Sequence, residues 1–474
     1  MSLSLRSTSV IVVCLGLVGA LCLVVLPVAP MAAAAKNLPS SPWSYTSNPN
    51  PSSNDALSSV SCTSANDCIA VGYALKGSNI DQTLVEEWNG QSWAVSPSPD
   101  QGTISNALSG VSCTSAVDCV AVGSTGGGAT ASTLIESFDG STWSIVPSPD
   151  PGTLFNTLNG VSCVSATSCV AVGYDYSGSE ILQTLTESFD GSDWSVVSSP
   201  DVGTSYNALE AVSCVSMTSC MAVGQETDDA GSYQTLTESF DGSDWSVVSS
   251  PDVGTGYNTL ESVSCLSPTD CEATGYDYQP LIESWNGTNW TVTPNPMAGE
   301  GNLEGVSCVN AADCTAVGQA AGKKQTYGAL IESWNGVSWS TTLEYIPPGG
   351  SSGILMGVSC TGVLSCHAAG SDGTFSGNVQ ILTMAGSFRP PAVGPIKPAK
   401  GKVGKKVTIT GDNLADASSV TFNGVSAVII SDTSVQIVVR VPIGATTGPV
   451  AVTTAVGTAA SAMGFQVLGK KGHS

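Results

Sequence analysis

Positive charge is scarce in this sequence of 474 residues. It contains 14 lysines and arginines against 38 aspartates and glutamates, which gives a formal net charge of −24. The imbalance lies in residues 37–389, whose net charge is −31, whereas residues 390–474 carry +5. An acidic body repels a phosphate backbone, so we predict that nucleic acid is not a partner.

Histidine is also scarce, since His367 and His473 are the only two. A lone histidine can act as a general base. No serine or cysteine nucleophile is identifiable beside His367, so we interpret it as a packing residue and predict no catalytic residue. The sequence also lacks a phosphate-binding glycine loop that opens a helix. We therefore predict no cofactor and no metal site.

Long apolar runs are missing after residue 28. The one long run, Val10 to Val28, follows the positive Arg6 and precedes small residues that are typical of a signal-peptidase site. We predict a signal peptide over residues 1–35, cleaved after Ala35. An uncleaved N-terminal anchor is the alternative and would be the only membrane contact. Either way, the protein is expected to be secreted or held at the cell surface.

Cysteine, by contrast, is frequent, and 14 of the 16 cysteines follow the predicted signal. They form seven C-x5-C pairs: Cys62/Cys68, Cys113/Cys119, Cys163/Cys169, Cys214/Cys220, Cys265/Cys271, Cys308/Cys314 and Cys360/Cys366. An even count, a constant spacing and an export signal together predict seven disulfides. Thiolate zinc sites usually need four ligands, and each unit offers only two cysteines.

Each cysteine pair belongs to a repeat that recurs about every 50 residues and begins with VSC. In the unit from Leu108, the runs LSGVSC, CVAVG, TLIESF and TWSIV have the composition of β-strands. Asp139-Gly140 separates the last two runs, and Asp-Gly between apolar runs is a strong hairpin signal. The unit is therefore predicted to be a four-stranded antiparallel meander, and such units repeated radially make a β-propeller.

Tryptophan marks the fourth strand and indicates how the ring closes. Seven of the ten tryptophans lie in predicted fourth strands: Trp43, Trp93, Trp143, Trp194, Trp245, Trp290 and Trp339. The seventh unit ends after its third strand, near Phe388, whereas Trp43 lies in an extra strand before the first unit. We predict that the N-terminal strand completes the last blade of a propeller over residues 37–389. The offset termini argue against a linear solenoid or separate modules.

The composition changes at residue 390, and the following β-rich runs contain neither cysteine nor tryptophan. They predict a small β-sandwich over residues 390–468. The segments VTITGDNL, VTFNG and VPIGATTGPV resemble the IPT/TIG immunoglobulin-like family in register. The resemblance implies a spacer or interaction module of secreted proteins and no catalysis. The predicted fold class is thus all-β, a seven-bladed β-propeller followed by an immunoglobulin-like β-sandwich, with residues 469–474 as a disordered tail.

The repeats resemble, more loosely, secreted bacterial repeat propellers. Segments such as SFDGSTW are also similar to the Asp-box of sialidase-like propellers, but Gly140 follows Asp139 directly, which makes the turn one residue shorter. Sialidases also need an arginine cluster for the sugar carboxylate. The three arginines are Arg6, Arg389 and Arg440, and none lies within a blade. We therefore exclude sialidase activity.

A glutamate recurs in the third strand of six units: Glu86, Glu136, Glu187, Glu238, Glu283 and Glu332. Glycoside hydrolysis uses two carboxylates that lie close together. Residues at one repeated position are instead spread around the ring, so we interpret these glutamates as buried structural groups. Glu226, Asp228 and Asp229 lack the spacing of a calcium loop and are interpreted as a solvated acidic loop.

Tyrosines gather in the loops between second and third strands, which vary most among the units. Tyr73, Tyr174 and Tyr276 share one repeated position, and Asp175, Tyr176, Asp277 and Tyr278 complete two YDY motifs. Tyr206, Tyr233 and Tyr257 lie nearby in the chain. Tyrosine rings with carboxylate acceptors can stack on sugars or anchor a protein. We predict the first seven of these residues as ligand-binding, with local packing as the alternative.

These observations favour a non-catalytic extracellular binding or adhesion protein. Variable loops on one face of a rigid scaffold are a usual way to build a binding surface. The expected ligand is an extracellular carbohydrate or protein. A polysaccharide hydrolase or lyase and a structural cell-surface spacer are the alternatives, because fold does not decide among them.

Overall fold

The computed structural model describes residues 43–468 with short gaps at 78–79, 103, 128–129, 177–180, 204, 229, 254–255, 298, 323–325, 346–349, 363–364, 375–378, 387–390, 413, 415–416, 434–435 and 455–456. The predicted signal peptide and the C-terminal tail lie outside the described residues, as do Asp229 and His473. Within the described part of the chain, no helix has the length and apolar character that crossing a membrane requires.

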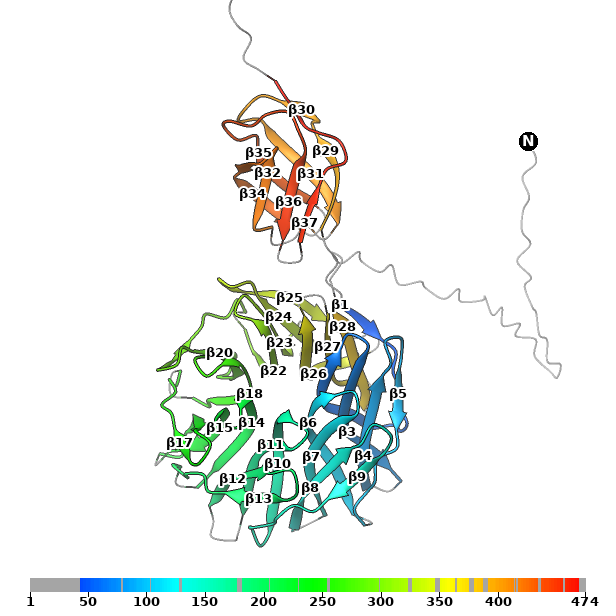
Figure 1. Ribbon diagram of the computed structural model, residues 1–474, viewed down its shortest axis with the longest axis vertical. Coiled ribbons are helices and arrows are strands. Elements are labelled where there is room, and N and C mark those ends of the chain that lie inside the picture. The colour runs from blue at the N-terminus through cyan, green and yellow to red at the C-terminus, as the bar shows by residue number, and fades with distance from the viewer. Residues whose placement is uncertain are drawn as a thin grey trace, which may run out of the picture. The chain divides into compact units, whose positions relative to one another are not determined.

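Strands before residue 387 form seven antiparallel blades around a ring, numbered here in chain order (Figure 1). Blade 1 contains β2 (Asp55–Ser64), β3 (Asp67–Lys76), β4 (Ile80–Trp88) and β5 (Trp93–Ser96). Blade 2 contains β6 (Ser105–Ser115), β7 (Asp118–Gly127), β8 (Thr130–Phe138) and β9 (Trp143–Val146). Blade 3 contains β10 (Phe155–Ser165), β11 (Ser168–Tyr176), β12 (Leu182–Phe189) and β13 (Trp194–Val197).

The remaining blades repeat this order. Blade 4 contains β14 (Asn207–Ser216), β15 (Ser219–Thr227), β16 (Tyr233–Phe240) and β17 (Trp245–Val247). Blade 5 contains β18 (Thr259–Ser267), β19 (Asp270–Tyr276), β20 (Pro280–Trp285) and β21 (Trp290–Val292). Blade 6 contains β22 (Gly301–Asn310), β23 (Asp313–Ala321), β24 (Tyr327–Trp334) and β25 (Trp339–Tyr345). Blade 7 contains β26 (Gly350–Gly362), β27 (Ser365–Thr374), β28 (Val379–Gly386) and β1 (Trp43–Thr46).

The two ends of the propeller sequence meet in blade 7. β1 pairs antiparallel with β28, so that Trp43 lies opposite Gly386 and Thr46 opposite Thr383. The innermost strands of the first and last blades, β2 and β26, are also in contact. The N-terminal strand thus provides the fourth strand of the last blade, and the ring is closed by hydrogen bonds between segments more than 330 residues apart.

The core of the propeller lies between neighbouring blades. The leucine three residues before each VSC motif is buried in every blade, as Leu57 and Leu158 illustrate at 0% exposure. One typical cluster joins Val71 of blade 1 to Leu108 and Trp143 of blade 2. Each blade therefore buries its apolar faces against its neighbours, which is why the repeat is stable only as a stack.

All seven predicted disulfides are present and confirm the cysteine pairing. In each, the two cysteines face each other across the first and second strands with Cα atoms 4.0 Å apart. Seven disulfides in one domain indicate an oxidising environment.

The two cysteines of each disulfide differ in burial. The first cysteine of every pair is half-buried at the end of the innermost strand. The second lies in the apolar core between blades and is at most 4% exposed: Cys68, Cys119, Cys169, Cys220, Cys271, Cys314 and Cys366. Each disulfide therefore joins the hairpin end to the core and also contributes to the packing of the blades.

The serine before the first cysteine of each motif joins adjacent blades. The Cys113 amide of blade 2 donates a hydrogen bond to the Ser61 hydroxyl of blade 1 at 3.0 Å. The same bond recurs at all seven blade junctions, with Ser61, Ser112, Ser162, Ser213, Ser264, Ser307 and Ser359 as acceptors. The last of these runs from Cys62 back to Ser359, so the bonds form a closed circle around the axis.

The C-terminal β-sandwich has its own core and two main sheets. One sheet contains β29 (Ala392–Lys397), β31 (Lys406–Asp412), β35 (Gln436–Arg440) and β34 (Ile429–Thr433). The other contains β33 (Val425–Ala427), β32 (Ser419–Phe422), β36 (Val450–Thr454) and β37 (Gly457–Ala460). The short strands β30 (Lys400–Gly401) and β38 (Gln466–Val467) pair in parallel. Phe422 and Phe465 pack edge to face in the core between the sheets.

We predict that the serine circle contributes to stability at each junction. Substitution Ser162→Ala leaves the Cys214 amide without its acceptor and should lower the free energy of unfolding by about 1–2 kcal/mol. Ser195→Ala, at an exposed position of β13, is the control and should be nearly neutral. Denaturant unfolding of the oxidised protein measures both, and equal effects would show that the circle is not stabilising.

Candidate functional site

A β-bulge in the first strand of every blade directs one side chain to the propeller axis. The pairing register shifts between Leu209 and Ala211 in blade 4, which leaves Glu210 as the extra residue, and the same shift occurs in the other six blades. The glycine opposite is required, because a Cβ on Gly224 would lie 2.0 Å from the Ala208 carbonyl oxygen. A bulge re-aims a side chain, and here it points seven residues inward.

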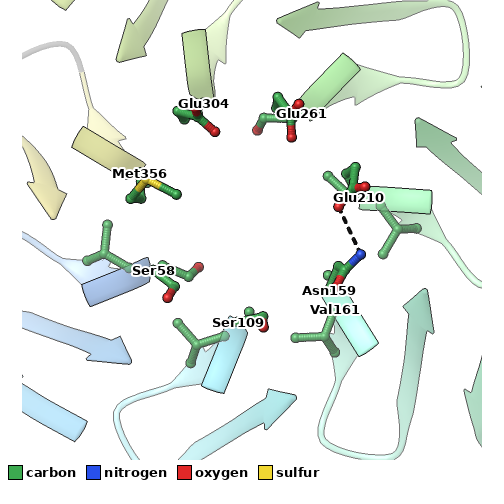
Figure 2. A pocket seen from close by; sticks show the side chains of 18 of the residues that line it. Ser58, Ser109, Asn159, Val161, Glu210, Glu261, Glu304 and Met356 are labelled. Carbon is green, nitrogen blue, oxygen red and sulfur yellow. Dashed lines mark hydrogen bonds between the residues drawn. The ribbon is translucent and has the colours of Figure 1, made fainter. Parts of the chain in front are cut away.

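These bulge residues line a cavity of about 350 Å³ on the axis. They are Ser58, Ser109, Asn159, Glu210, Glu261, Glu304 and Met356, in blade order (Figure 2). The scaffold is nearly seven-fold, but this lining is not. Three successive blades provide carboxyl groups, whereas the other four provide hydroxyl, amide and thioether groups.

We call this axial cavity the channel. The carboxyl groups of Glu210, Glu261 and Glu304 in it lie close enough to affect one another's pKa values. Burial, followed by the charges of Glu261 and Glu210, raises the pKa of Glu304 to about 8. Burial also raises the pKa of Glu210 and of Glu261. The Asn159 amide donates to Glu210 at 2.8 Å (Figure 2), and the Thr259 hydroxyl donates to Glu261 at 3.1 Å. The channel can therefore hold protons at neutral pH and release them when a cation or a hydrogen-bond donor enters.

Five tyrosine rings form a continuous row over blades 4 and 5. They are Tyr206, Tyr233, Tyr257, Tyr276 and Tyr278, and successive ring centroids lie 5.6, 4.4, 6.0 and 5.9 Å apart. Two belong to blade connections, two to strand ends and one to a loop between second and third strands. Tyr278, at the end of the row, is 58% exposed. This tyrosine row offers aromatic surface with phenol groups along its length.

The tyrosine row reaches the channel through one glutamine. The Tyr257 hydroxyl donates to Gln225 Oε1 at 2.9 Å. Gln225 also hydrogen-bonds the Glu210 carboxyl, which lowers the pKa of Glu210 and opposes the larger effect of its burial. Burial and the charge of Glu210 raise the pKa of Tyr206. The row and the carboxyl side of the channel are thus one connected region.

The structure separates the seven residues predicted as ligand-binding. Tyr276 and Tyr278 belong to the row, and Asp277 lies between them, where burial raises its pKa. Tyr174 lies near Tyr206, at the other end of the row. Asp175 is only 8% exposed.

The other two predicted tyrosines lie elsewhere. Tyr176 packs on Phe155 within blade 3, with ring centroids 6.3 Å apart. Tyr73 belongs to blade 1, where burial and the charges of Asp81 and Asp55 raise its pKa. The repeated position therefore distributes Tyr73, Tyr174 and Tyr276 over blades 1, 3 and 5, and of these three Tyr276 is the one that belongs to the tyrosine row.

The predicted disulfide cysteines take no part in this region. The axial cavity is lined by none of the fourteen. All seven buried second cysteines lie in the clusters between blades, each against apolar side chains of the repeat: Cys68, Cys119, Cys169, Cys220, Cys271, Cys314 and Cys366. Cys220, Cys265 and Cys271 also line a second cavity of about 200 Å³ between blades 4 and 5, which shares no residue with the axial cavity.

The channel residues were not predicted from the sequence, although a signal for them exists. The motif reads Leu, one variable residue, one small residue, then VSC, and the variable residue is the bulge. The sequence thus shows which residue varies, but it does not show that this residue is a bulge. In a strand that alternates without a bulge, the residue would lie on a different face from the one it occupies.

The six repeated third-strand glutamates are buried, and all except Glu86 are hydrogen-bonded to the connection that leaves the preceding blade. The Ser98 hydroxyl, in the connection leaving blade 1, donates to Glu136 of blade 2 at 2.6 Å. Equivalent bonds reach Glu187, Glu238, Glu283 and Glu332 from Ser148, Ser199, Ser250 and Asn295. Each glutamate is 0% exposed, and this arrangement agrees with a structural role.

His367 packs between blade 7 and blade 1. It is 5% exposed, and its ring centroid lies 5.1 Å from that of Trp88 and 5.9 Å from that of Trp93. Burial lowers its pKa. Among the described residues, no group of three or more His, Cys, Asp or Glu side chains is arranged to hold a metal ion.

Comparison with known proteins identifies the C-terminal domain. The model of the IPT/TIG domain family matches residues 391–467. Residues 391–467 form an IPT/TIG domain. No curated protein sequence matches the chain.

Solved structures resemble the chain in fold. A structure described as YCF48 bound to D1 peptide has a TM-score of 0.49 and 11% identity, and it covers 74% of this chain and 99% of its own. YCF48 from Cyanidioschyzon merolae has a TM-score of 0.47 and 14% identity, with 73% and 98% covered. The WD40 β-propeller domain of Doa1 has a TM-score of 0.47 and 10% identity, with 72% and 96% covered. At these identities the likeness concerns the fold alone.

The buried glutamates predict that stability falls as pH rises. Burial raises the pKa of Glu187 to about 8, against an ordinary value of 4.5. Between these two values the folded protein holds a proton that the unfolded chain has lost, so the free energy of unfolding decreases with pH. Glu187→Gln removes this ionisation and should reduce the loss between pH 5 and pH 8 by about 1 kcal/mol or more.

Denaturant titrations at several pH values measure this difference. Asp193→Asn, at an exposed turn of the same blade, is the control for the general effect of removing one negative charge. If both variants changed the pH dependence equally, long-range repulsion in the acidic propeller would be the cause, and burial of Glu187 would not.

Proposed function

We propose that this protein is a secreted or cell-surface binding protein without catalytic activity, and that it binds an extracellular carbohydrate. The site is the tyrosine row together with the Glu210 side of the channel. The observation that carries the proposal is the run of five tyrosine rings, at 4.4–6.0 Å, that leads to a carboxyl-lined cavity through Gln225.

The chemistry of the region suits a sugar chain. Sugar rings present C–H faces that stack on aromatic rings, and their hydroxyl groups donate to carboxylate and amide oxygens. The row supplies the faces, whereas Glu210, Gln225 and Asp277 supply acceptors. Seven disulfides and a ring closed by β1 hold these groups on a rigid scaffold, which limits the entropy lost on binding.

A protein ligand is the other possible occupant of this surface. Tyrosine is enriched at the centres of protein interfaces as well. A glycan array and a set of cell-wall polysaccharides, probed with residues 36–474 in the oxidised state, distinguish the two. Absence of binding to every carbohydrate would exclude a sugar ligand. Protein binding and a spacer role would then be the two remaining functions.

We predict that binding depends on the tyrosine row and does not depend on the repeated tyrosine position. Tyr257→Ala and Tyr276→Ala each remove a ring from the middle of the row and should weaken binding by about tenfold or more. Tyr73→Ala is the matched control, because Tyr73 occupies the same repeat position as Tyr276 in a distant blade. Equal losses in all three variants would indicate destabilisation, which their thermal midpoints measure.

A polysaccharide hydrolase is the second candidate function. Its support is the meeting of Glu210, Glu261 and Glu304 in one cavity with raised pKa values, since a hydrolase needs one protonated and one ionised carboxyl. Release of reducing ends from the bound polysaccharide tests it. Glu304→Gln should then abolish release and leave binding intact, whereas no release by the unmodified protein rejects hydrolysis.

A further inference from the structure

One end of the IPT/TIG domain combines clustered lysines with exposed apolar side chains. Lys397, Lys400, Lys402, Lys405 and Lys406 fall within ten residues, and all are exposed. Arg440 pairs with Lys406 across β31 and β35 and is also exposed. We call these six residues the basic end. They include most of the positive charge of a domain whose net charge is opposite to that of the propeller.

The described acidic residues of the domain lie away from the basic end. They are Asp412, opposite Ala392, and Asp432, opposite Ile437. Asp412 lies at the opposite end of β31 from Lys406, and Asp432 faces Ile437, three positions along β35 from Arg440. The six cationic side chains are clustered at one end of the domain although like charges repel one another. This concentration of positive charge favours attraction to an anionic partner.

The lysine segment is held firmly by the domain. The Gln466 amide donates to the Ala399 carbonyl at 3.1 Å, and the Leu468 amide donates to the Gly401 carbonyl at 2.8 Å. The turn that follows is closed by Lys405 N–H to the Lys402 carbonyl at 3.0 Å. Arg440 donates to the Gly404 carbonyl at 3.2 Å, which places its guanidinium over this turn. The charges are therefore presented by ordered backbone.

Large apolar side chains project from the same end. Ile443 is 88% exposed, Met463 is 84% exposed and Val403 is 47% exposed. The turn at Val403 is bonded to the start of the Ile443 loop, through Gly404 N–H to the Val441 carbonyl at 2.8 Å. The turn at Met463 is bonded to the end of that loop, through Phe465 N–H to the Gly448 carbonyl at 2.7 Å. The three side chains thus belong to three adjoining turns.

We propose that this end of the IPT/TIG domain docks on an anionic lipid membrane. Lysines near such a surface are attracted to its headgroups, and apolar side chains on adjoining turns can enter the boundary between headgroups and acyl chains. A soluble polyanion would use the lysines but would leave Ile443 and Met463 in water. Salt limits the range of the propeller's negative charge, because at about 0.1 M charges more than about 10 Å apart are largely screened.

Vesicle cosedimentation tests the proposal on residues 36–474 with the disulfides formed. This form contains every residue of the propeller and IPT/TIG cores, and it lacks the apolar N-terminal run that could bind lipid by itself. We expect binding to vesicles that mix phosphatidylglycerol with phosphatidylcholine, little binding to phosphatidylcholine alone, and release at high salt. Equal binding to both kinds of vesicle, or to neither, would overturn the proposal.

Two variants separate the contributions of charge and apolar contact. The triple change Lys402→Glu, Lys405→Glu and Lys406→Glu should weaken vesicle binding by at least about tenfold. The double change Ile443→Ser and Met463→Ser should weaken vesicle binding severalfold and leave binding to dextran sulfate unchanged. Lys76→Glu, at an exposed propeller position, is the control for charge reversal. Unchanged vesicle binding in the Ile443/Met463 variant would show a site for soluble polyanions and reject membrane docking.

Discussion

The hydrogen bond from a cysteine amide to the serine hydroxyl of the preceding blade determines the geometry at the propeller axis. Seven such bonds, each 3.0 Å long, keep the innermost strands at one spacing all around the ring. The spacing is close enough that a Cβ on Gly160 would lie 2.9 Å from the Ala211 Cα atom. Small residues are therefore needed beside the serine, and the cavity has its width because these strands cannot move apart.

This constraint explains why the channel is where the blades can differ. The leucine, the small residue, the serine and the cysteine of each motif are all occupied by contacts within or between blades. The bulge residue is the variable member of the motif that lines the cavity, beside the small residues and most of the motif valines, so its chemistry can vary without disturbing the ring. Carboxyl groups from three neighbouring blades give the cavity one acidic side, and Gln225 connects that side to the tyrosine row. The nearly seven-fold scaffold thereby has one acidic side that differs from the rest of the ring.

Much of the fold could be predicted because its signals are local and repeated. The C-x5-C spacing predicts the cross-strand disulfide, and Trp43 with its six counterparts predicts the antiparallel pairing of β1 with β28. The site could be predicted only in part. Tyr206, Tyr233 and Tyr276 occupy different positions in the repeat, and they meet because connections and strand ends of neighbouring blades converge. The bulge depends on backbone pairing, which residue alternation does not encode.

The third-strand glutamates show that the same scaffold buries carboxyl groups, and burying their negative charge is energetically unfavourable. All six are fully buried, and five accept a hydrogen bond from a hydroxyl or amide group of the preceding connection, as Glu136 does from Ser98. A neutral donor stabilises a carboxyl group less than a cation would, so burial still dominates and raises the pKa of Glu136 to about 7. Protonation removes the cost of burying a charge, whereas the hydrogen bond from the connection favours the ionised carboxylate, and burial is the larger of the two effects.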